Sequence, residues 1–442
     1  MKIQELLFSL RKFVAPNWGR GAARNNAPRE ADFHRLHLEE FEQRLVPSTA
    51  YVSPIAGAGH YASFQQAYAV AKPGDVIQIE PGEVIKSLNM NPVTINKRLM
   101  IQGDPAYGAA LVASDVEVLT GTTGVVFSNL NFKSTNGLIL DAGSKQTSVL
   151  NSTLTEVTEN IGAGNYGNII SGNVITGFAL LNGDPSIQTG DQVTGNTFTG
   201  PGVAHDASLY MINNNSATVS NNTFTVNGGI FDRAIHIVNS ANVSLDGNNI
   251  HFSSPDSTSI GMLVEQSAYF PGTSSAHIWQ NSVSTGGLGT GLYLDKEVAG
   301  NNMSMDVEFD NFNNNAVGVF IQGDGASAGV IDLGGGSLGS HGGNNFAMFT
   351  PTAAVSGHFA ISLHDTSSSY TVPAWFNIWQ HSITTAWFDA HTVTKDGADG
   401  FVNDAIDTSL GGTEAGTGQI IMETASGPIP TGGWPHGHVP IL

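Results

Sequence analysis

Two acidic residues stand at matching places in two strand-like segments, and together they could support chemistry on a carbohydrate. Glu265 ends the segment IGMLVE, and Asp295 ends the segment TGLYLD. If the two segments lie side by side, their carboxyl groups come within about 5 Å of each other, the separation that a retaining glycoside hydrolase uses. Glu265 and Asp295 are therefore the candidate catalytic residues.

Aromatic and imidazole side chains accompany these two acids. Tyr293 precedes the second acid by two residues, and His236 and Phe320 hold the same place in the segments RAIHI and VGVFI. Tyr269 follows the first acid in the loop QSAYFPGTSSA, which can bring it to the same side. Because aromatic rings stack on the C–H faces of sugars while acids accept hydrogen bonds from hydroxyl groups, these four are the candidate substrate-binding residues.

The elements that must position these residues are short strands. Five segments alternate apolar and outward positions with period 2, and no helical period separates them. They are SLYMI (208–212), RAIHI (233–237), IGMLV (260–264), TGLYL (290–294) and VGVFI (317–321). The alternation predicts one outward row of Met211, His236, Leu263, Tyr293 and Phe320. It predicts the next outward row as Asn213, Val238, Glu265, Asp295 and Gln322.

An Asn-x-apolar phrase repeats in phase with these strands. It occurs at Asn173, Asn196, Asn222, Asn248 and Asn281, with steps of 23, 26, 26 and 33 residues. Looser versions occur at Ser152, Asp310, Gly336 and Asn377. A period of 20–50 residues indicates a repeat architecture, and stacked parallel strands without crossover helices indicate an all-β solenoid, the parallel β-helix.

The repeated asparagines are expected at one corner of each coil. Asparagine enters the left-handed backbone region more readily than most residues, so it suits a sharp corner. Stacked corner asparagines can also hydrogen-bond to one another along the axis and form a ladder. We therefore expect Asn173, Asn196, Asn222 and Asn248 to lie in a line.

The start of the repeat region carries a resemblance to a known superfamily. In SFQQAYAVAKPGDVIQIEPGEV (63–84), Ser63 and Gln66 form a capping box that begins a short helix. Pro73-Gly74 ends this helix, and DVIQI is expected to be the first strand. This order resembles the opening of right-handed parallel β-helix proteins of the pectate-lyase-like superfamily, and with the repeats it covers about 55–425. The resemblance implies a right-handed β-helix with a short N-terminal capping helix.

The same resemblance leaves the activity open. The superfamily includes lyases, hydrolases, esterases, epimerases, phage tailspikes and surface proteins without catalysis. In enzymes of this superfamily, the strand row that corresponds to the row of Glu265 and Asp295 faces the active-site groove.

The two ends of the chain differ from the repeat region. Residues 1–50 open with the helical pattern MKIQELLFSLRKFV and are predicted to be an export or targeting segment, helical or disordered. Within it, RLHLEEFEQRLVPSTA (35–50) resembles the LxLExLExRxVPS segment of surface and secreted planctomycete proteins, which implies an extracellular or cell-surface location. Residues 51–425 are the predicted β-helix, and 426–442 a disordered tail rich in proline and glycine.

Composition narrows the class of partner. The chain has 17 Lys and Arg against 37 Asp and Glu; residues 1–50 hold eight and six of them, so the rest holds nine and 31, a net charge of −22. A body this acidic argues against nucleic acid, whereas a polysaccharide or other cell-envelope glycan, or Ca²⁺, suits it better. There is no cysteine, no run apolar enough for a transmembrane helix, and no H-E-x-x-H or EF-hand pattern. His436 and His438 could bind a metal but fall in the predicted disordered tail, so no cofactor is assigned.

Two functions from different classes follow. The first is a non-catalytic secreted or surface protein whose β-helix serves as a spacer and polysaccharide-binding face. The second is a polysaccharide lyase or glycoside hydrolase acting on the same outer face. A lyase needs a basic residue near the acids, and after residue 50 the only arginines are Arg98 and Arg233. This shortage favours the first function; the oligomeric state cannot be derived.

Overall fold

The computed structural model describes residues 47–55, 57–87, 91–160, 164–200, 207–227, 232–270, 272–296, 303–323, 329–346, 359–364, 371–374, 377, 406–407 and 419–421. The chain divides into the compact units Met1–Val46 and Pro47–Leu442. The predicted export segment (up to residue 46) and the predicted C-terminal tail lie outside the described residues.

Three long sheets, which we call sheets 1, 2 and 3, contain most of the strands. Sheet 1 has 13 strands, in the order β2 (His60–Tyr61), β1 (Thr49–Val52), β3 (Val76–Ile79), β6 (Met100–Gly103), β9 (Val126–Ser128), β12 (Ser148–Leu150), β15 (Ile169–Ser171), β18 (Gln192–Thr194), β21 (Thr218–Ser220), β24 (Val243–Asp246), β27 (Ser274–Trp279), β30 (Met303–Glu308) and β32 (Val330–Asp332).

Sheet 2 has nine strands, in the order β28 (Ser282–Ser284), β25 (Asn249–Phe252), β22 (Thr223–Val226), β19 (Thr197–Phe198), β16 (Val174–Ile175), β13 (Thr153–Leu154), β10 (Leu130–Phe132), β7 (Ala110–Val112) and β4 (Val84–Ile85). Sheet 3 has 12 strands, in the order β35 (Ile406–Asp407), β33 (Phe359–His364), β31 (Val317–Gly323), β29 (Thr290–Lys296), β26 (Ile260–Gln266), β23 (Arg233–Val238), β20 (Ala207–Ile212), β17 (Ala179–Asn182), β14 (Val157–Glu159), β11 (Leu138–Leu140), β8 (Val116–Val118) and β5 (Val93–Ile95). A separate pair joins β34 (Thr371–Pro373) to β36 (Gln419–Ile421).

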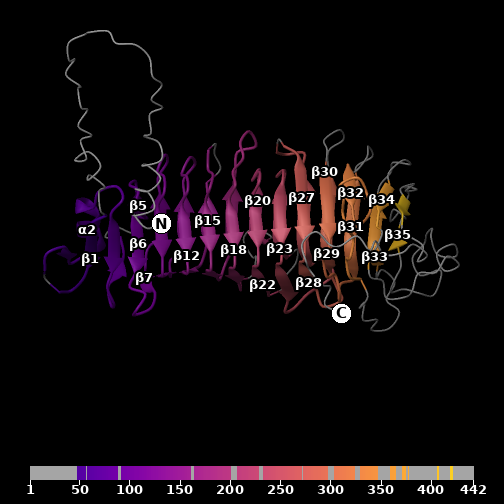
Figure 1. The fold of residues 1–442 in the computed structure, drawn as a ribbon. Helices are drawn as coiled ribbons and strands as arrows, with labels where there is room; N and C mark the ends of the chain where they lie inside the picture. Colours follow the sequence, from indigo (N-terminus) through magenta and orange to yellow (C-terminus); the bar gives the residue numbers. More distant parts are fainter. Residues whose placement is uncertain are drawn as a thin grey trace, which may run out of the picture. The chain divides into compact units, whose positions relative to one another are not determined.

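The chain visits the three sheets in turn, and each strand pairs in parallel with its equivalent in the next coil. Figure 1 shows these strands side by side along the stack. The predicted parallel β-helix is confirmed. Its right-handed sense stays a prediction, in line with the general hand of parallel crossovers.

The core lies between the three sheets and is built from the inward-facing residue of each alternation. Strand burial alternates accordingly, and the largest buried side chains are phenylalanines from neighbouring coils. Phe198 and Phe224 occupy equivalent places in β19 and β22 and stack with ring centroids 4.5 Å apart. The apolar side chains of each coil therefore pack against one another and against those of the neighbouring coils, as expected for a solenoid.

The predicted asparagine ladder is present at the corner between sheets 1 and 2. The Oδ1 of each ladder residue accepts from the backbone N–H and the Nδ2 of the preceding one, with distances of 2.9–3.1 Å at Asn196, Asn222 and Asn248. Asp310 continues the ladder after Asn281. The next member is Asn344, so the proposal of Gly336 was wrong.

The left-handed backbone residue is the one before each ladder position, not the ladder residue itself. Positive φ angles occur at Asn151, Gly172, Gly195, Asn221, Gly247, Gln280, Phe309 and Gly343. The bend at this position lets the following amide turn inward, where its Nδ2 reaches a backbone carbonyl, as Asn222 does with Val193. The sequence thus located the corner correctly but assigned the strained position one residue late.

A short helix, α2 (Phe64–Val70), lies near the start of the stack, where the sequence predicted a helix. Ser63 accepts from the N–H of Gln66, whose side chain accepts in turn from Ala62. Phe64 and Ala67 are buried in the hydrophobic core. The ammonium of Lys97 binds the carbonyls of Tyr68 and Ala71 at the other end of the helix.

The first strand begins earlier than predicted. β1 precedes the helix and pairs with β3, with Thr49 opposite Val76 and Ala50 opposite Ile77. DVIQI is therefore not the first strand, and two residues assigned to the export segment belong to the sheet. A deletion that ends at residue 50 would remove half of β1, so we expect the separable segment to end before Thr49.

Two buried carboxyl groups lie near the corner between sheets 3 and 1. Oδ1 and Oδ2 of Asp191 accept from the N–H of Asn168 and the Nδ2 of Asn214, and Glu159 accepts from Asn168 and Asn182. Burial raises the pKa of Asp191 to about 6 against the lowering effect of these hydrogen bonds. Burial, with the charge of Asp191, also raises the pKa of Glu159 well above its usual value.

This pair predicts a pH-dependent stability. A carboxyl group whose pKa is raised in the folded state contributes stability at pH values below its pKa in the unfolded chain, near 3.8. This contribution is lost as the pH rises through the folded-state pKa of about 6. Asp191→Asn removes the charge, and the Asn214 amide can invert to accept from the new Nδ2. We expect the free energy of unfolding of the variant, relative to that of the wild type, to increase by about 1–3 kcal/mol as the pH rises from 4 to 7. Urea unfolding of both proteins across this range measures the difference; an unchanged difference would contradict the assignment.

Candidate functional site

The outward face of sheet 3 contains the residues that the sequence singled out. In register, Tyr210, His236, Leu263, Tyr293 and Phe320 form one row across β20, β23, β26, β29 and β31. The adjacent row contains Ile212, Val238, Glu265, Asp295 and Gln322.

The expected rows were thus correct in four of the five strands. In β20, Met211 and Asn213 were wrong, because Met211 pairs with the inward Ile237 and is fully buried. The outward residues there are Tyr210 and Ile212. With the tyrosine, the segment has four adjacent nonpolar or aromatic residues, Leu209 to Ile212, which obscured the period of 2.

His236 and Glu265 form the central contact of this face. Nε2 of His236 lies 2.8 Å from Oε2 of Glu265, and the two side chains are 6% and 17% exposed. The imidazole also lies 3.4 Å from Nη1 of Arg233 and stacks on Tyr210 with a centroid separation of 4.6 Å. His236 is therefore mainly a buried residue that holds the Glu265 carboxylate in place.

The environment of Glu265 favours its ionised form. Burial acts to raise its pKa, but the hydrogen bond and the charge of His236, with Ser267 and Arg233, outweigh burial and lower it. Glu265 is therefore an anionic hydrogen-bond acceptor at neutral pH. It does not have the raised pKa of a general acid.

Tyr293 lies beside both acids and is about half-buried. Burial, followed by the charge of Asp295 and that of Glu265, raises the pKa of its hydroxyl group, so the hydroxyl stays protonated. The hydroxyl donates to Oε1 of Gln322 at 2.5 Å. Its ring meets Phe320 edge to face, with centroids 4.8 Å apart and planes at 85°. Tyr293 and Phe320 form a small aromatic surface next to two carboxylates.

The fold brings five of the six predicted residues into one stretch of sheet 3. His236, Glu265, Tyr293, Asp295 and Phe320 belong to adjacent strands. Tyr269 lies in the turn after β26 and is 86% exposed. Among the described residues, no hydrogen bond or ring contact links it to the other five.

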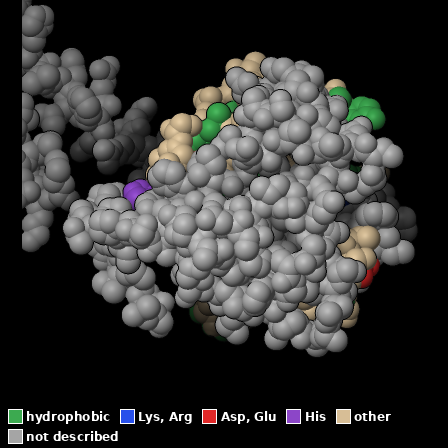
Figure 2. Space-filling model, turned by 90° about the vertical axis from the view of Figure 1, so that its right-hand side faces the viewer, with side chains coloured by type: hydrophobic (Ala, Val, Ile, Leu, Met, Phe, Trp, Pro, Cys, Tyr) green, Lys and Arg blue, Asp and Glu red, His purple; other side chains and the backbone are tan. Residues whose placement is uncertain are grey.

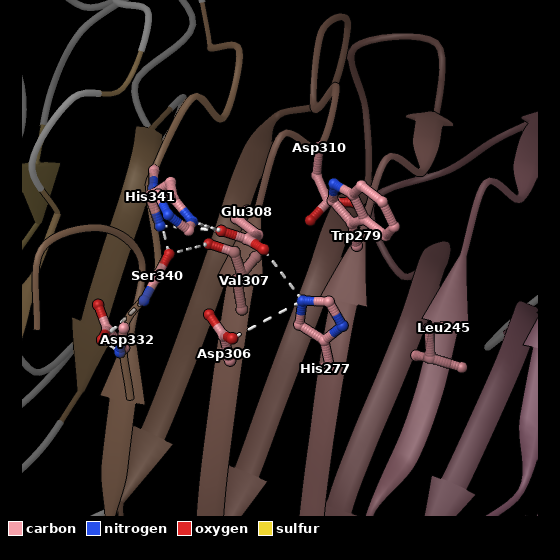
Figure 3. Close-up of polar contacts among 12 residues, drawn as sticks. Leu245, His277, Trp279, Asp306, Val307, Glu308, Asp310, Asp332, Ser340 and His341 are labelled. Atoms are coloured by element: carbon pink, nitrogen blue, oxygen red, sulfur yellow. Dashed lines mark hydrogen bonds and ion pairs between the residues drawn. The ribbon is translucent and has the colours of Figure 1, made fainter. Parts of the chain in front are cut away.

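A second polar cluster, on sheet 1, was not predicted. His277 on β27 and Asp306 and Glu308 on β30 have ligand-type atoms within 4.8 Å of one another. Nε2 of His277 is 3.1 Å from Oε1 of Glu308 and 3.7 Å from Oδ2 of Asp306. Figure 3 shows the three side chains pointing toward one another, with His341 on the far side of Glu308.

The groups of this cluster titrate differently from one another. The hydrogen bond from His277 and those from His341 overcome the effect of burial and lower the pKa of Glu308 to about 2. Burial and the charge of Glu308 raise the pKa of Asp306 to about 6. The hydrogen bond to Glu308 leads the causes that raise the pKa of His277. The charge of each group therefore affects the pKa values of the others.

A long loop positions His341 in this cluster. Asp332 is fully buried at the end of β32 and accepts hydrogen bonds from five backbone N–H groups at 2.9–3.3 Å. They belong to Gly334, Gly336, Leu338, Gly339 and Ser340. The loop GGGSLGS is thereby wrapped around one carboxylate, and the next residue, His341, reaches Glu308.

The sequence did hold a signal for the sheet 1 cluster. In SSAHIW and MSMDVE, His277, Trp279, Asp306 and Glu308 all fall at outward positions of alternating strands. The register that pairs His277 with Asp306 follows from aligning successive coils on the asparagine ladder. The sequence prediction missed the cluster because it considered only the acids of sheet 3.

Figure 2 views the right-hand end of Figure 1, where described hydrophobic side chains occur in small separate groups. No helix in the described part of the chain has the length and hydrophobicity of a membrane span.

Three sheets of parallel strands, visited in turn by each coil, decide the fold family. The chain is a parallel β-helix protein. No protein-family model and no curated protein matches this β-helix protein. It is similar in structure to the catalytic domain of a GH87 α-1,3-glucanase solved with nigerose, at 12% identity and a TM-score of 0.32, over 82% of this chain and 68% of that one. It is also similar to a pectate lyase, Pel9A, at 15% identity and a TM-score of 0.23, over 82% and 88% of the two chains. At these values the similarity concerns the fold only.

Proposed function

We propose that the outward face of sheet 3 binds a polysaccharide and that the β-helix serves as its extended, non-catalytic support. The observation that carries this proposal is the fixed, anionic Glu265 carboxylate beside the aromatic pair of Tyr293 and Phe320. Ring faces suit the C–H surface of a sugar, and carboxylates accept from its hydroxyl groups. Successive coils repeat about every 4.8 Å, so a polymer can contact several of them.

The titration behaviour of this face supports binding over catalysis. A retaining hydrolase needs one carboxyl group that stays protonated and one that is ionised. Glu265 has a lowered pKa, with His236 hydrogen-bonded to its carboxylate, so it would be a poor general acid. As an ionised nucleophile opposite Asp295 it would still fit a hydrolase, and this is the second candidate function.

The proposal includes a secreted or cell-surface location. The support for it is the resemblance of residues 35–50 to a segment of surface and secreted proteins. Cell fractionation of the natural host, with detection by antibody, tests this location. Recovery of the protein only in the cytoplasmic fraction would contradict it.

Tyr293→Ala is expected to weaken polysaccharide binding by about 1–2 kcal/mol, or roughly 5–30-fold, because it removes the ring that stacks on the sugar. Affinity electrophoresis against a panel of neutral and acidic polysaccharides measures the change. Tyr107→Ala is the matched control, since Tyr107 is 72% exposed but lies between β6 and β7, away from this face. Equal retention of both variants with the wild type would contradict the binding site.

Glu265→Gln separates binding from turnover. For a binding protein the change should cost about one charged hydrogen bond, near 1–2 kcal/mol, and the wild type should release no product. For a hydrolase the same change should abolish the release of reducing sugar, because an amide is not a nucleophile. Reducing-sugar and unsaturated-product assays on the panel decide between the two functions.

A further inference from the structure

The sheet 1 cluster has the composition and geometry of a metal site, separate from the face proposed to bind polysaccharide. Its potential ligand atoms are Nε2 of His277, Oδ2 of Asp306 and Oε1 of Glu308. All three side chains project from the same face of two hydrogen-bonded strands, β27 and β30, whose register places His277 opposite Asp306. Rigid strands hold such a constellation more firmly than loops do.

The spacing of the atoms matches a small divalent ion. Two ligand atoms at 2.0–2.1 Å from Zn²⁺ in tetrahedral geometry lie about 3.3–3.4 Å apart. The distances from His277 to Glu308 and Asp306, 3.1 and 3.7 Å, lie on either side of this value. The oxygens of Asp306 and Glu308 lie within 4.8 Å of each other, so side-chain rotation that brings them to this spacing would place all three atoms at a common distance from one ion.

The surroundings orient the ligand groups. The second oxygen of Glu308 accepts from the backbone N–H of His341 and lies 2.8 Å from its Nδ1, which leaves Oε1 directed at His277. Trp279 stacks on the imidazole of His277 with ring centroids 5.9 Å apart. Outer contacts of this kind fix the ligands of metal sites.

Charge and exposure also fit a cation. A metal ion displaces the Nε2 proton of His277, and the two carboxylates and the neutral imidazole then carry a net charge of −2, which one divalent ion balances. His277 is 40% exposed, so an ion can enter and keep a water ligand.

We propose that His277, Asp306 and Glu308 bind one late first-row divalent metal ion, such as Zn²⁺. The nitrogen ligand selects this class over Ca²⁺, which prefers six to eight oxygen ligands. Three protein ligands and a solvent-facing position leave room for a water molecule or an oxygen atom of a bound molecule.

Isothermal titration of the EDTA-dialysed full chain with Zn²⁺ tests the proposal. We expect one equivalent to bind to the wild type, with affinity reduced at least about tenfold in His277→Ala and in Glu308→Gln. Co²⁺ should give visible absorption bands that are lost in the same variants, whereas equimolar Ca²⁺ should not displace it. If the circular dichroism spectrum of either variant differs from that of the wild type, Asp306→Asn replaces that variant in the titration.

Two controls exclude other histidines. His251→Ala removes an exposed imidazole from sheet 2 and should leave the bound equivalent unchanged. His436 and His438, outside the described residues, form an HGH sequence that could bind Zn²⁺ by itself. If the equivalent is absent from the wild type, survives both ligand substitutions, or is lost in His436→Ala/His438→Ala, the proposed site is wrong.

Discussion

Asn222→Ala is expected to lower the free energy of unfolding by about 3–5 kcal/mol, a loss well above the usual cost of a single substitution. Asn222 is fully buried, accepts from the N–H and Nδ2 of Asn196, and donates to Val193 and Asn248. Alanine would remove all four of these hydrogen bonds, leave the N–H of Asn196 without its acceptor inside the stack, and open a small cavity. Urea unfolding followed by circular dichroism measures the loss.

Asn249→Ala is the matched control for this substitution. Asn249 directly follows the ladder residue Asn248 in sequence, but its side chain is exposed on β25. We expect a change within about 0.5 kcal/mol. Equal effects from the two asparagines would show that the ladder contributes no more than surface asparagines do.

Asp332→Ala is expected to cost about 3–5 kcal/mol, because one buried carboxylate holds five backbone N–H groups of the following loop. The damage should be local, since each coil of a solenoid contacts only its neighbours. Hydrogen exchange of residues 334–341 should therefore accelerate by at least about tenfold, while that of the early coils stays unchanged.

Asp184→Ala provides the comparison. Its carboxylate accepts from the N–H and hydroxyl of Ser186 in a single exposed turn. We expect a loss below about 1 kcal/mol. Unchanged exchange of the loop after Asp332→Ala would mean that the loop is held by other contacts.

The sequence was sufficient for the fold because the fold is periodic. An Asn phrase and an alternating strand, repeated in phase, determine which strands are neighbours, and so Glu265 was correctly placed opposite Asp295. Periodicity could not decide which of two residues of the repeat occupies a given structural position when both suit that position. Met211 was taken as outward because both it and Tyr210 suit an apolar strand, and Gly336 was taken for a ladder residue because the long Asp332 loop shifts the phase to Asn344.

The sequence could not predict side-chain contacts between coils, and this limited the prediction of the candidate site. The pairing of His236 with Glu265 depends on a rotamer and on burial, so the sequence predicted His236 as a ligand contact rather than as a support for the carboxylate. The sheet 1 cluster depends further on a loop of unusual conformation, since His341 reaches Glu308 only after the chain wraps around Asp332. Strand periodicity contains no information about such a loop.

Hydrogen–deuterium exchange with and without a retained polysaccharide tests the central claim most directly. We predict slower exchange in β26, β29 and β31, where Glu265, Tyr293, Asp295 and Phe320 face outward, and unchanged exchange in sheet 2. The Tyr293→Ala variant should lose this protection under the same conditions. Protection confined to sheet 1 or sheet 2, or retention of no polysaccharide on the panel, would contradict the proposed function.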